Sequence, residues 1–187
     1  MSVQERRDRE RAARHQLIID AARELAEAEG WDAVTTRRLA DRIEYSQPVL
    51  YSHFRSKDAI VEAVALQGFA ELAGHLRQAR AGADDPLAAV LHAYADFAAA
   101  NPVLYDAMFA RAADLPFAGP DAPEPLKAAF GELLAVFTGL AGEADAPTLT
   151  EVGWSALHGL LTLDRAGRLS AGNRELRLAT LVERLRS

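Results

Sequence analysis

The stretch QPVLYSHFRSK, from Gln47 to Lys57, has the pattern of a helix N-terminus followed by closely spaced aromatic and basic residues. Pro48 fits the first turn of a helix, because its missing N–H would have no intrahelical partner there. Leu50 and Phe54 are four residues apart and predict the buried face of this helix. The outer side of the helix then carries Gln47, Pro48, Val49, Tyr51 and His53.

The neighbouring segments predict a compact three-helix bundle around that stretch. A helix of about 10–29 has one apolar stripe and closes at a glycine, and the charged residues before it favour either a helical extension or an exposed basic arm. The segment TTRRLADRI, residues 35–43, predicts a helix of about two turns with a threonine cap. Ser46 is placed to cap the next helix, and Ser56 is placed to cap a longer one that ends near residue 80.

The connection of three or four residues between the helices at 35–43 and 47–54 has the length of a helix-turn-helix, whose second helix can enter the major groove of DNA. The hydroxyl of Tyr51 and the imidazole of His53 suit phosphate oxygens, and Lys57 adds a positive charge at the start of the following helix. In the first helical turn, the glutamine can pair with an adenine edge, and the proline and valine can touch a thymine methyl group. A half-buried aromatic cluster is the alternative interpretation of this pattern.

The distribution of charge separates the chain into two parts. The formal net charge is -6, but residues 1–57 carry eleven Lys and Arg against ten Asp and Glu, whereas residues 58–187 carry ten against seventeen. Residues 33–57 have five basic side chains and two acidic ones. A local basic face can therefore meet a polyanion while the rest of the molecule repels it.

The composition also limits where this protein works. The sequence has no cysteine, which excludes disulfides and cysteine-based sites and suits a reducing cytosol. The N-terminal segment is charged where a signal peptide needs an apolar region, and no apolar run is long enough to span a bilayer. We expect a soluble, cytoplasmic protein with no membrane partner.

The rest of the chain also predicts helices only. Alanine, leucine, glutamate and arginine dominate it, and alternating β-branched runs are missing. The segment DLPFAGPDAPEP holds four of the eight prolines and predicts a loop. The expected helices lie at about 86–100, 102–113, 124–142, 147–167 and 173–186. The sequence therefore predicts an all-α fold of about nine helices.

The block VTTRRLADRIEYSQPVLYSHFRSKDAIVEAV, together with the helix before it, closely resembles the DNA-binding domain of TetR/AcrR-family transcriptional regulators. The resemblance covers about residues 15–66 and includes the apolar-Tyr-x-His-Phe core followed by a basic residue, Lys and an acidic residue. It implies phosphate contacts from Tyr51, His53 and Lys57 and further contacts from Thr36 and Arg37. It implies base contacts from Gln47, Pro48 and Val49.

The chain departs from the family pattern in the turn before that helix. The family commonly has glycine where this sequence has Glu44, and a residue other than glycine must adopt positive φ there or reshape the turn. This departure sustains an alternative to the repressor interpretation, namely an activator or a small-molecule sensor of the same fold with weakened DNA binding.

The second part of the chain carries its own resemblance. Trp154, His158 and Gly159 look like the Trp-to-His-Gly signature of one class of TetR C-terminal domain, although a packed aromatic beside a hydrogen-bonded histidine is the plainer interpretation. The resemblance implies an effector pocket and a dimer interface formed by the helices at about 147–167 and 173–186. The candidate pocket residues, each of which can equally be core, are Tyr94, Phe97, Met108, Phe109, Phe130, Phe137, Trp154 and His158.

Taken together, these observations predict a DNA-binding domain at 1–57 and a helical domain for effector binding and dimerisation at 58–187. The expected function is that of a homodimeric, ligand-responsive repressor that binds a palindromic operator in double-stranded DNA. The few charges in the candidate pocket favour an apolar or amphipathic effector, and we expect no metal and no cofactor. A helical enzyme using His92, His158 or Asp164 is disfavoured, since the sequence has no nucleophile elbow, phosphate-binding glycine loop or paired-carboxylate motif.

Overall fold

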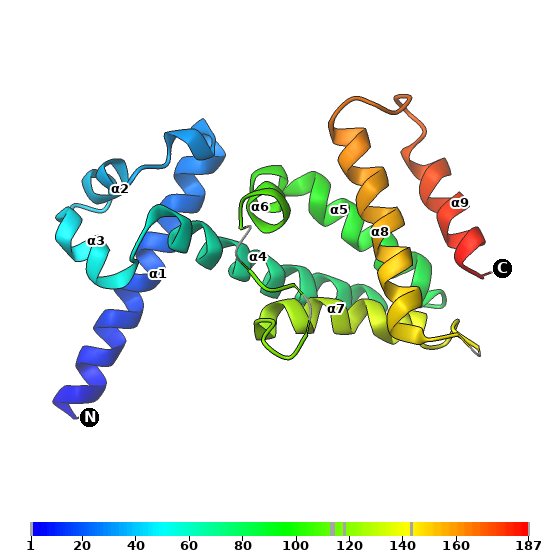
Figure 1. The fold of residues 1–187 in the computed structure, drawn as a ribbon, viewed down its shortest axis with the longest axis horizontal. Helices are drawn as coiled ribbons and strands as arrows, with labels where there is room; N and C mark the ends of the chain where they lie inside the picture. The colour runs from blue at the N-terminus through cyan, green and yellow to red at the C-terminus, as the bar shows by residue number, and fades with distance from the viewer. Residues whose placement is uncertain (1, 113–114, 118, 143, 187) are drawn as a thin grey trace. The chain divides into compact units, whose positions relative to one another are not determined.

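The computed structural model describes residues 2–112, 115–117, 119–142 and 144–186, and over these residues it confirms the all-α prediction (Figure 1). The described residues form nine α-helices and no strand, with a 3₁₀ turn at Trp31–Ala33 and a π-helical turn at Ala107–Arg111. The helices are α1 (Val3–Glu29), α2 (Thr36–Arg42), α3 (Gln47–His53), α4 (Lys57–Arg80), α5 (Pro86–Ala100), α6 (Pro102–Asp106), α7 (Glu124–Phe137), α8 (Ala146–Arg165) and α9 (Arg174–Arg186).

Helix α1 resolves the choice that the sequence left open at the N-terminus. The segment before residue 10 is helical, and a capping box starts it: Glu5 N–H donates to Ser2 Oγ over 3.1 Å, and Ser2 N–H donates to Glu5 Oε2 over 2.7 Å. The residues of α1 that are buried begin at Ile18. The first half of α1 is therefore a helix that packs little of its own surface.

Contacts divide the chain into two compact units. The first unit is Met1–Gly68 with Pro102–Asp121, and the second is Phe69–Asn101 with Ala122–Ser187. Helix α4 contributes to both, and half of its most apolar stretch is buried inside the protein, although by length and composition alone it could cross a membrane.

In the first unit, α6 and the π-helical turn pack against the helices of the N-terminal bundle. The indole N–H of Trp31 donates to the carbonyl of Val103 over 3.0 Å. Gly68 allows the closest approach, because a Cβ there would lie 2.7 Å from Met108 Sδ. The sequence predicted one helix over 102–113, but the α-helix ends at Asp106 and the π-helical turn that follows closes with a bond from Ala112 N–H to Ala107 O.

In the second unit, α5, α7, α8 and α9 pack around a core of leucine, valine and aromatic side chains. Helix α7 ends at Phe137, earlier than the predicted residue 142, and Thr138 Oγ1 then donates to the carbonyl of Leu134 over 2.7 Å. Helix α9 is tied to α5 by ion pairs of Arg174 with Asp96 and of Arg186 with Asp85.

A buried carboxylate joins α7 to α4 in this unit. Glu132, whose side chain is 10% exposed, accepts hydrogen bonds from Arg77 Nε over 2.8 Å and from Arg80 Nε and Nη2 over 3.0 and 2.9 Å. Burial alone would raise the pKa of the Glu132 carboxyl, but the bonds from both arginines outweigh it and hold the pKa below its ordinary value. The bonds of Glu132 with the two arginines therefore stabilise the fold only while the Glu132 carboxyl is ionised.

We expect Glu132→Gln to lower the free energy of unfolding at neutral pH by about 1–2 kcal/mol, because it removes charge-assisted bonds from a site with limited access to water. The difference in free energy of unfolding between the wild type and the variant should be fully present above the ordinary glutamate pKa of about 4.3. It should shrink as pH falls through the lower pKa that Glu132 has in the folded state. Urea unfolding at several pH values measures both. Glu27→Gln, which breaks an exposed i,i+4 pair with Arg23, should cost roughly 0.5 kcal/mol or less. Equal losses for the two variants would contradict this account.

Candidate nucleic-acid interface

The turn between α2 and α3 keeps its helix-turn-helix geometry despite the missing glycine. Glu44 adopts a φ of +57°, the only positive φ outside glycine among the described residues. Tyr45 N–H donates to Ala40 O over 3.0 Å, and Glu44 N–H reaches Asp41 O at 3.4 Å. This is the hydrogen-bond pattern of a Schellman cap. The turn is therefore preserved, and Glu44 carries the left-handed strain.

We expect Glu44→Gly to raise the free energy of unfolding by about 1 kcal/mol, because the left-handed strain of about 1–2 kcal/mol is partly offset by the greater freedom of glycine in the unfolded chain. Gly167 ends α8 in the same type of cap, with Arg168 N–H bonded to Leu163 O over 2.9 Å. Gly167→Ala should therefore cost a similar amount. Urea unfolding of the two variants checks both signs, and a destabilised Glu44→Gly would mean that the glutamate side chain stabilises the turn.

Helix α3 presents its first turn to solvent. Leu50 and Phe54 are buried at 1% and 6% exposure, which confirms the predicted inner face. Gln47 and Pro48 are exposed and Val49 is half-buried. Ser46 is the N-cap residue of α3, as predicted, but its side chain forms no capping hydrogen bond in this structure. The three side chains assigned to base contacts thus share one end of α3, and their contact with bases stays a prediction.

The candidate phosphate ligands lie on three different helices. Tyr51 is 51% exposed, and its hydroxyl is 3.4 Å from Thr36 Oγ1, so α2 and α3 bring these two hydroxyls together. Arg37 is exposed beside Thr36. The ammonium of Lys57 donates to the carbonyl of Trp31 over 2.9 Å and is half-buried. Lys57 therefore has a structural bond that the sequence did not reveal, and its ammonium still has other N–H groups for an anion.

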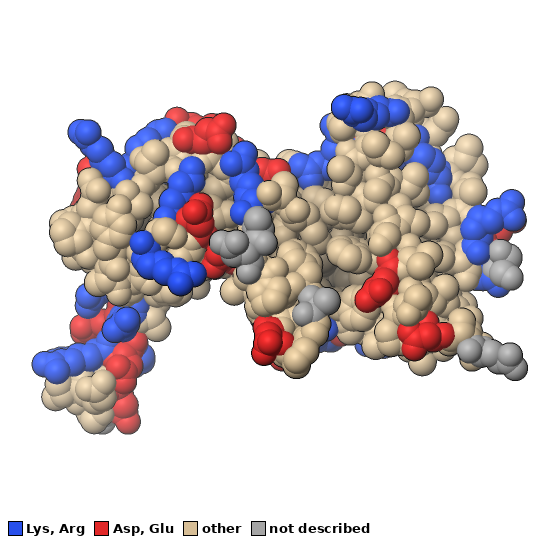
Figure 2. Space-filling view, in the orientation of Figure 1, with Lys and Arg blue, Asp and Glu red and all other residues tan. Residues whose placement is uncertain are grey.

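Two of the arginines that make this part of the sequence basic are neutralised by α1. Arg38 holds Glu29 through bonds of 2.5 and 2.9 Å, and Arg42 holds Glu24 over 2.9 Å. The sequence could not show these pairs, because the partners are 9 and 18 residues away. Figure 2 shows Lys and Arg side chains over the part of the molecule formed by α1 to α3, with acidic side chains among them.

His53 lies at the end of α3, next to the first half of α1. Its ring centroid is 6.2 Å from that of His15. Burial lowers the pKa of His53, and the positive charges of Arg11, His15 and Arg14 lower it further. A histidine surrounded by positive charge in this way is a better partner for an anion than for a cation.

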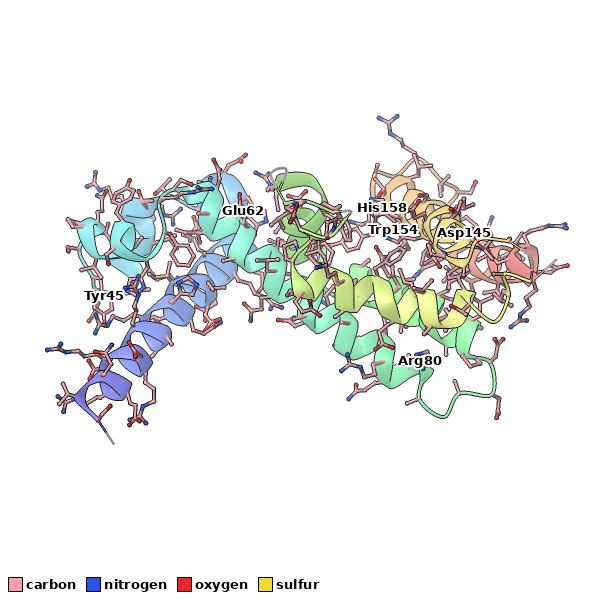
Figure 3. All side chains as sticks on the ribbon, turned by 60° about the horizontal axis from the view of Figure 1, so that its bottom comes forward. Tyr45, Glu62, Arg80, Asp145, Trp154 and His158 are labelled. Carbon is pink, nitrogen blue, oxygen red and sulfur yellow. The ribbon has the colours of Figure 1, made fainter. Side chains whose placement is uncertain are left out.

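The candidate effector residues are divided between the two units. Trp154 Nε1–H donates to the Tyr94 hydroxyl over 2.9 Å, and the Trp154 and His158 rings are 5.8 Å apart on α8 (Figure 3). Burial lowers the pKa of His158, with a smaller contribution from Arg165. In the same unit Phe97 and Phe137 are buried and Phe130 is half-buried, whereas Met108 and Phe109 belong to the π-helical turn of the first unit.

Comparison with known proteins places both parts of the chain. Residues 18–64 match the family described as bacterial regulatory proteins, tetR family, and residues 87–185 match the tetracyclin repressor-like C-terminal domain. The uncharacterised HTH-type transcriptional regulator Rv0681 of Mycobacterium tuberculosis (strain ATCC 25618 / H37Rv) is 32% identical over 157 residues, which cover 80% of this chain and 69% of that protein.

Two further similarities agree with these matches. The uncharacterised HTH-type transcriptional regulator YobS of Bacillus subtilis (strain 168) is 33% identical over 101 residues, and the match spans about half of each chain, 52% in both cases. The crystal structure of the TetR family transcriptional regulator PfmR from Thermus thermophilus has the same fold, with a TM-score of 0.62, 22% identity and coverage of 91% of this chain and 97% of that one. The chain therefore belongs to the TetR family of transcriptional regulators, with an N-terminal helix-turn-helix DNA-binding domain.

Proposed function

We propose that this protein is a homodimeric, ligand-responsive repressor that acts in the cytoplasm on a palindromic operator. The observation that carries the proposal is the exposed first turn of α3, with Gln47 and Pro48 in solvent and the Tyr51 and Thr36 hydroxyls beside it. A side-chain amide at the start of a recognition helix can form hydrogen bonds with the edge of an adenine base. Hydroxyl groups next to it can donate to phosphate oxygens of the DNA backbone. The repressor direction is supported by the description of the matched C-terminal family as tetracyclin repressor-like.

We assign DNA binding to residues 1–57, and we assign effector binding and dimerisation to residues 58–187. Of residues 102–121, those that the structure describes belong to the first unit, although the sequence assigns them to the domain for effector binding. Helix α4 connects the two units, because it begins at Lys57 in the first unit and ends at Arg80 in the second.

An exposed apolar surface on α8 and α9 supports the dimer. Val152 and Leu163 on α8 are 59% and 43% exposed, and Leu176 on α9 is 65% exposed. A groove of about 550 Å³ lies between the two helices and is lined by Leu160, Leu176 and Leu181 among others. A second copy of the chain would cover this surface. A twofold dimer would also place two α3 helices on successive major-groove faces, which lie about 34–36 Å apart.

We expect the wild-type protein to sediment as a dimer and Leu176→Glu to sediment as a monomer at the same micromolar concentration, because the variant places a charge in an apolar contact. Val3→Glu, a matched substitution at an exposed position on α1, should remain dimeric. A dimeric Leu176→Glu would remove the α8 and α9 surface from the proposed interface. Loss of the dimer should also weaken operator binding, since each half-site would be bound alone.

Regulation by an effector would act on the conformation of the DNA-binding unit. An inducer would bind better to a conformation whose α3 helices no longer match the half-site spacing. In the first unit, Val103 of α6 is bonded to the Trp31 indole, and the Trp31 carbonyl is bonded to Lys57. A shift of α6 would therefore reach Lys57 through one residue. An apolar or amphipathic compound that binds the protein should lower operator affinity at fixed salt, and binding without that change would contradict the proposed regulation.

A further inference from the structure

The first half of α1 lies outside the part of the chain that matches the family's DNA-binding model. That match begins at residue 18, whereas α1 begins at Val3. Residues 2–13 are all exposed, so no burial explains why this segment keeps its helical form. Residues 2–14 carry five arginines and three acidic residues, and the capping box and charge pairs stabilise the helix locally.

One face of this segment forms a cleft with the end of α3. Arg7, Glu10, Arg11 and Arg14 of α1 and Ser52 and His53 of α3 line the cleft, whose volume is about 260 Å³. The His15 ring stacks on the Phe54 ring with centroids 4.3 Å apart and planes at 19°, which fixes α1 against the end of α3. The position of the cleft is therefore set by packing.

The cleft has more positive charge than its own acidic group can neutralise. Its single carboxylate, Glu10, lies 3.6 Å from Arg14 and 3.9 Å from Arg6. Within the described residues, Arg7 and Arg11 form no ion pair, and as like charges at i,i+4 they disfavour the helix that carries them. The nearest other carboxylates are engaged elsewhere, since Glu5 closes the capping box and Asp8 accepts from Gln4.

We propose that this cleft binds a phosphate group of the DNA backbone, so that α1 and α3 hold one phosphate between them. Guanidinium groups and an imidazole N–H are donors suited to phosphate oxygens. The Ser52 hydroxyl contributes to the wall only, because it already donates to the Val49 carbonyl over 2.7 Å. Because α3 itself forms one wall, an anion held here lies beside the helix that enters the major groove. The inference rests on the proposed function and adds a contact made by residues outside the matched DNA-binding model.

The test compares Arg11→Gln with Arg9→Gln in the full-length protein. Both variants lose one positive charge from α1, but Arg9 is two positions away around the helix and does not line the cleft. Affinity for a palindromic duplex selected with the wild-type protein is measured from about 50 to 200 mM salt. Each lost phosphate contact should reduce the slope of log K against log salt by about 0.9, or roughly 1.8 for a dimer with two equivalent sites. Arg9→Gln should leave the slope near the wild-type value.

Three results would overturn the proposal. Equal slopes for Arg11→Gln and the wild type, with operator binding intact, would reject the cleft but leave the proposed function standing. Failure of the wild type to select any duplex would reject both. An Arg11-dependent shift of the His53 imidazole NMR signals by inorganic phosphate, without a change in the DNA slope, would mean that the cleft serves a free phosphate compound. Circular dichroism should show the same helix content in both variants, so that unfolding is excluded as the cause.

Discussion

Replacing Gln47 with alanine should remove discrimination between bases at one base pair of each half-site. Discrimination at the other base pairs of the operator should stay unchanged. Gln47 is exposed at the first position of α3, where a side-chain amide can form a bidentate pair with adenine. A pair of that kind is worth about 1–3 kcal/mol of discrimination, which corresponds to roughly 5–150-fold in affinity. Competition binding with operators that carry each single base change measures the effect.

Tyr51→Phe is the matched control for that experiment. The substitution keeps the exposed aromatic ring and removes only the hydroxyl, which lies near Thr36. This hydroxyl is proposed to contact a phosphate of the DNA backbone. The affinity of the variant should therefore fall by a similar factor for every duplex, with the order of preference unchanged. If both variants lost affinity uniformly across sequences, the assignment of base contacts to the first turn of α3 would be wrong.

Gly153→Ala should be the most destabilising of the small substitutions in the second unit. An alanine Cβ at Gly153 would lie 2.5 Å from Cε1 of Phe137, whose ring is 1% exposed. Because that ring is held in the core, the added methyl must displace α7 or α8, and overpacking of this kind costs about 1–3 kcal/mol. Urea unfolding of the purified protein measures the loss.

Gly131→Ala gives the matched control on α7. Nothing lies within 4 Å of a Cβ at Gly131, so the substitution should only improve helix propensity, by about 1 kcal/mol at most. The two glycine variants should thus change stability in opposite directions. A neutral Gly153→Ala would mean that Phe137 has room to move, which would favour a cavity beside Trp154 rather than a filled core.

Local sequence signals were sufficient for the starts of α2 and α4. Thr35 and Ser56 cap helices as predicted, and each accepts a bond from a backbone N–H three residues later. Such signals depend only on residues within one turn, so they can be recognised in the sequence. Glu44 is a local signal of the same kind. The sequence alone showed that a residue other than glycine at this position must adopt positive φ or reshape the turn.

Several features that the sequence did not predict depend on partners far along the chain. The Trp31 indole finds its acceptor 72 residues later, and Arg38 and Arg42 find carboxylates on another helix. Periodicity identifies an apolar face but does not say what covers it, which is why Met108 and Phe109 were grouped with aromatic residues of the other unit. The π-helical turn arises in the same way, since its residues pack against α4 at Gly68.

The measurement that tests the central claim most directly is selection of bound duplexes from a random DNA library with the purified wild-type protein at near-physiological salt. We predict enrichment of one palindromic sequence whose half-sites are about one helical turn apart, as a dimer with two α3 reading heads requires. The absence of any enriched sequence, from protein that is folded and dimeric, would contradict the proposed repressor and favour a sensor of the same fold with weakened DNA binding.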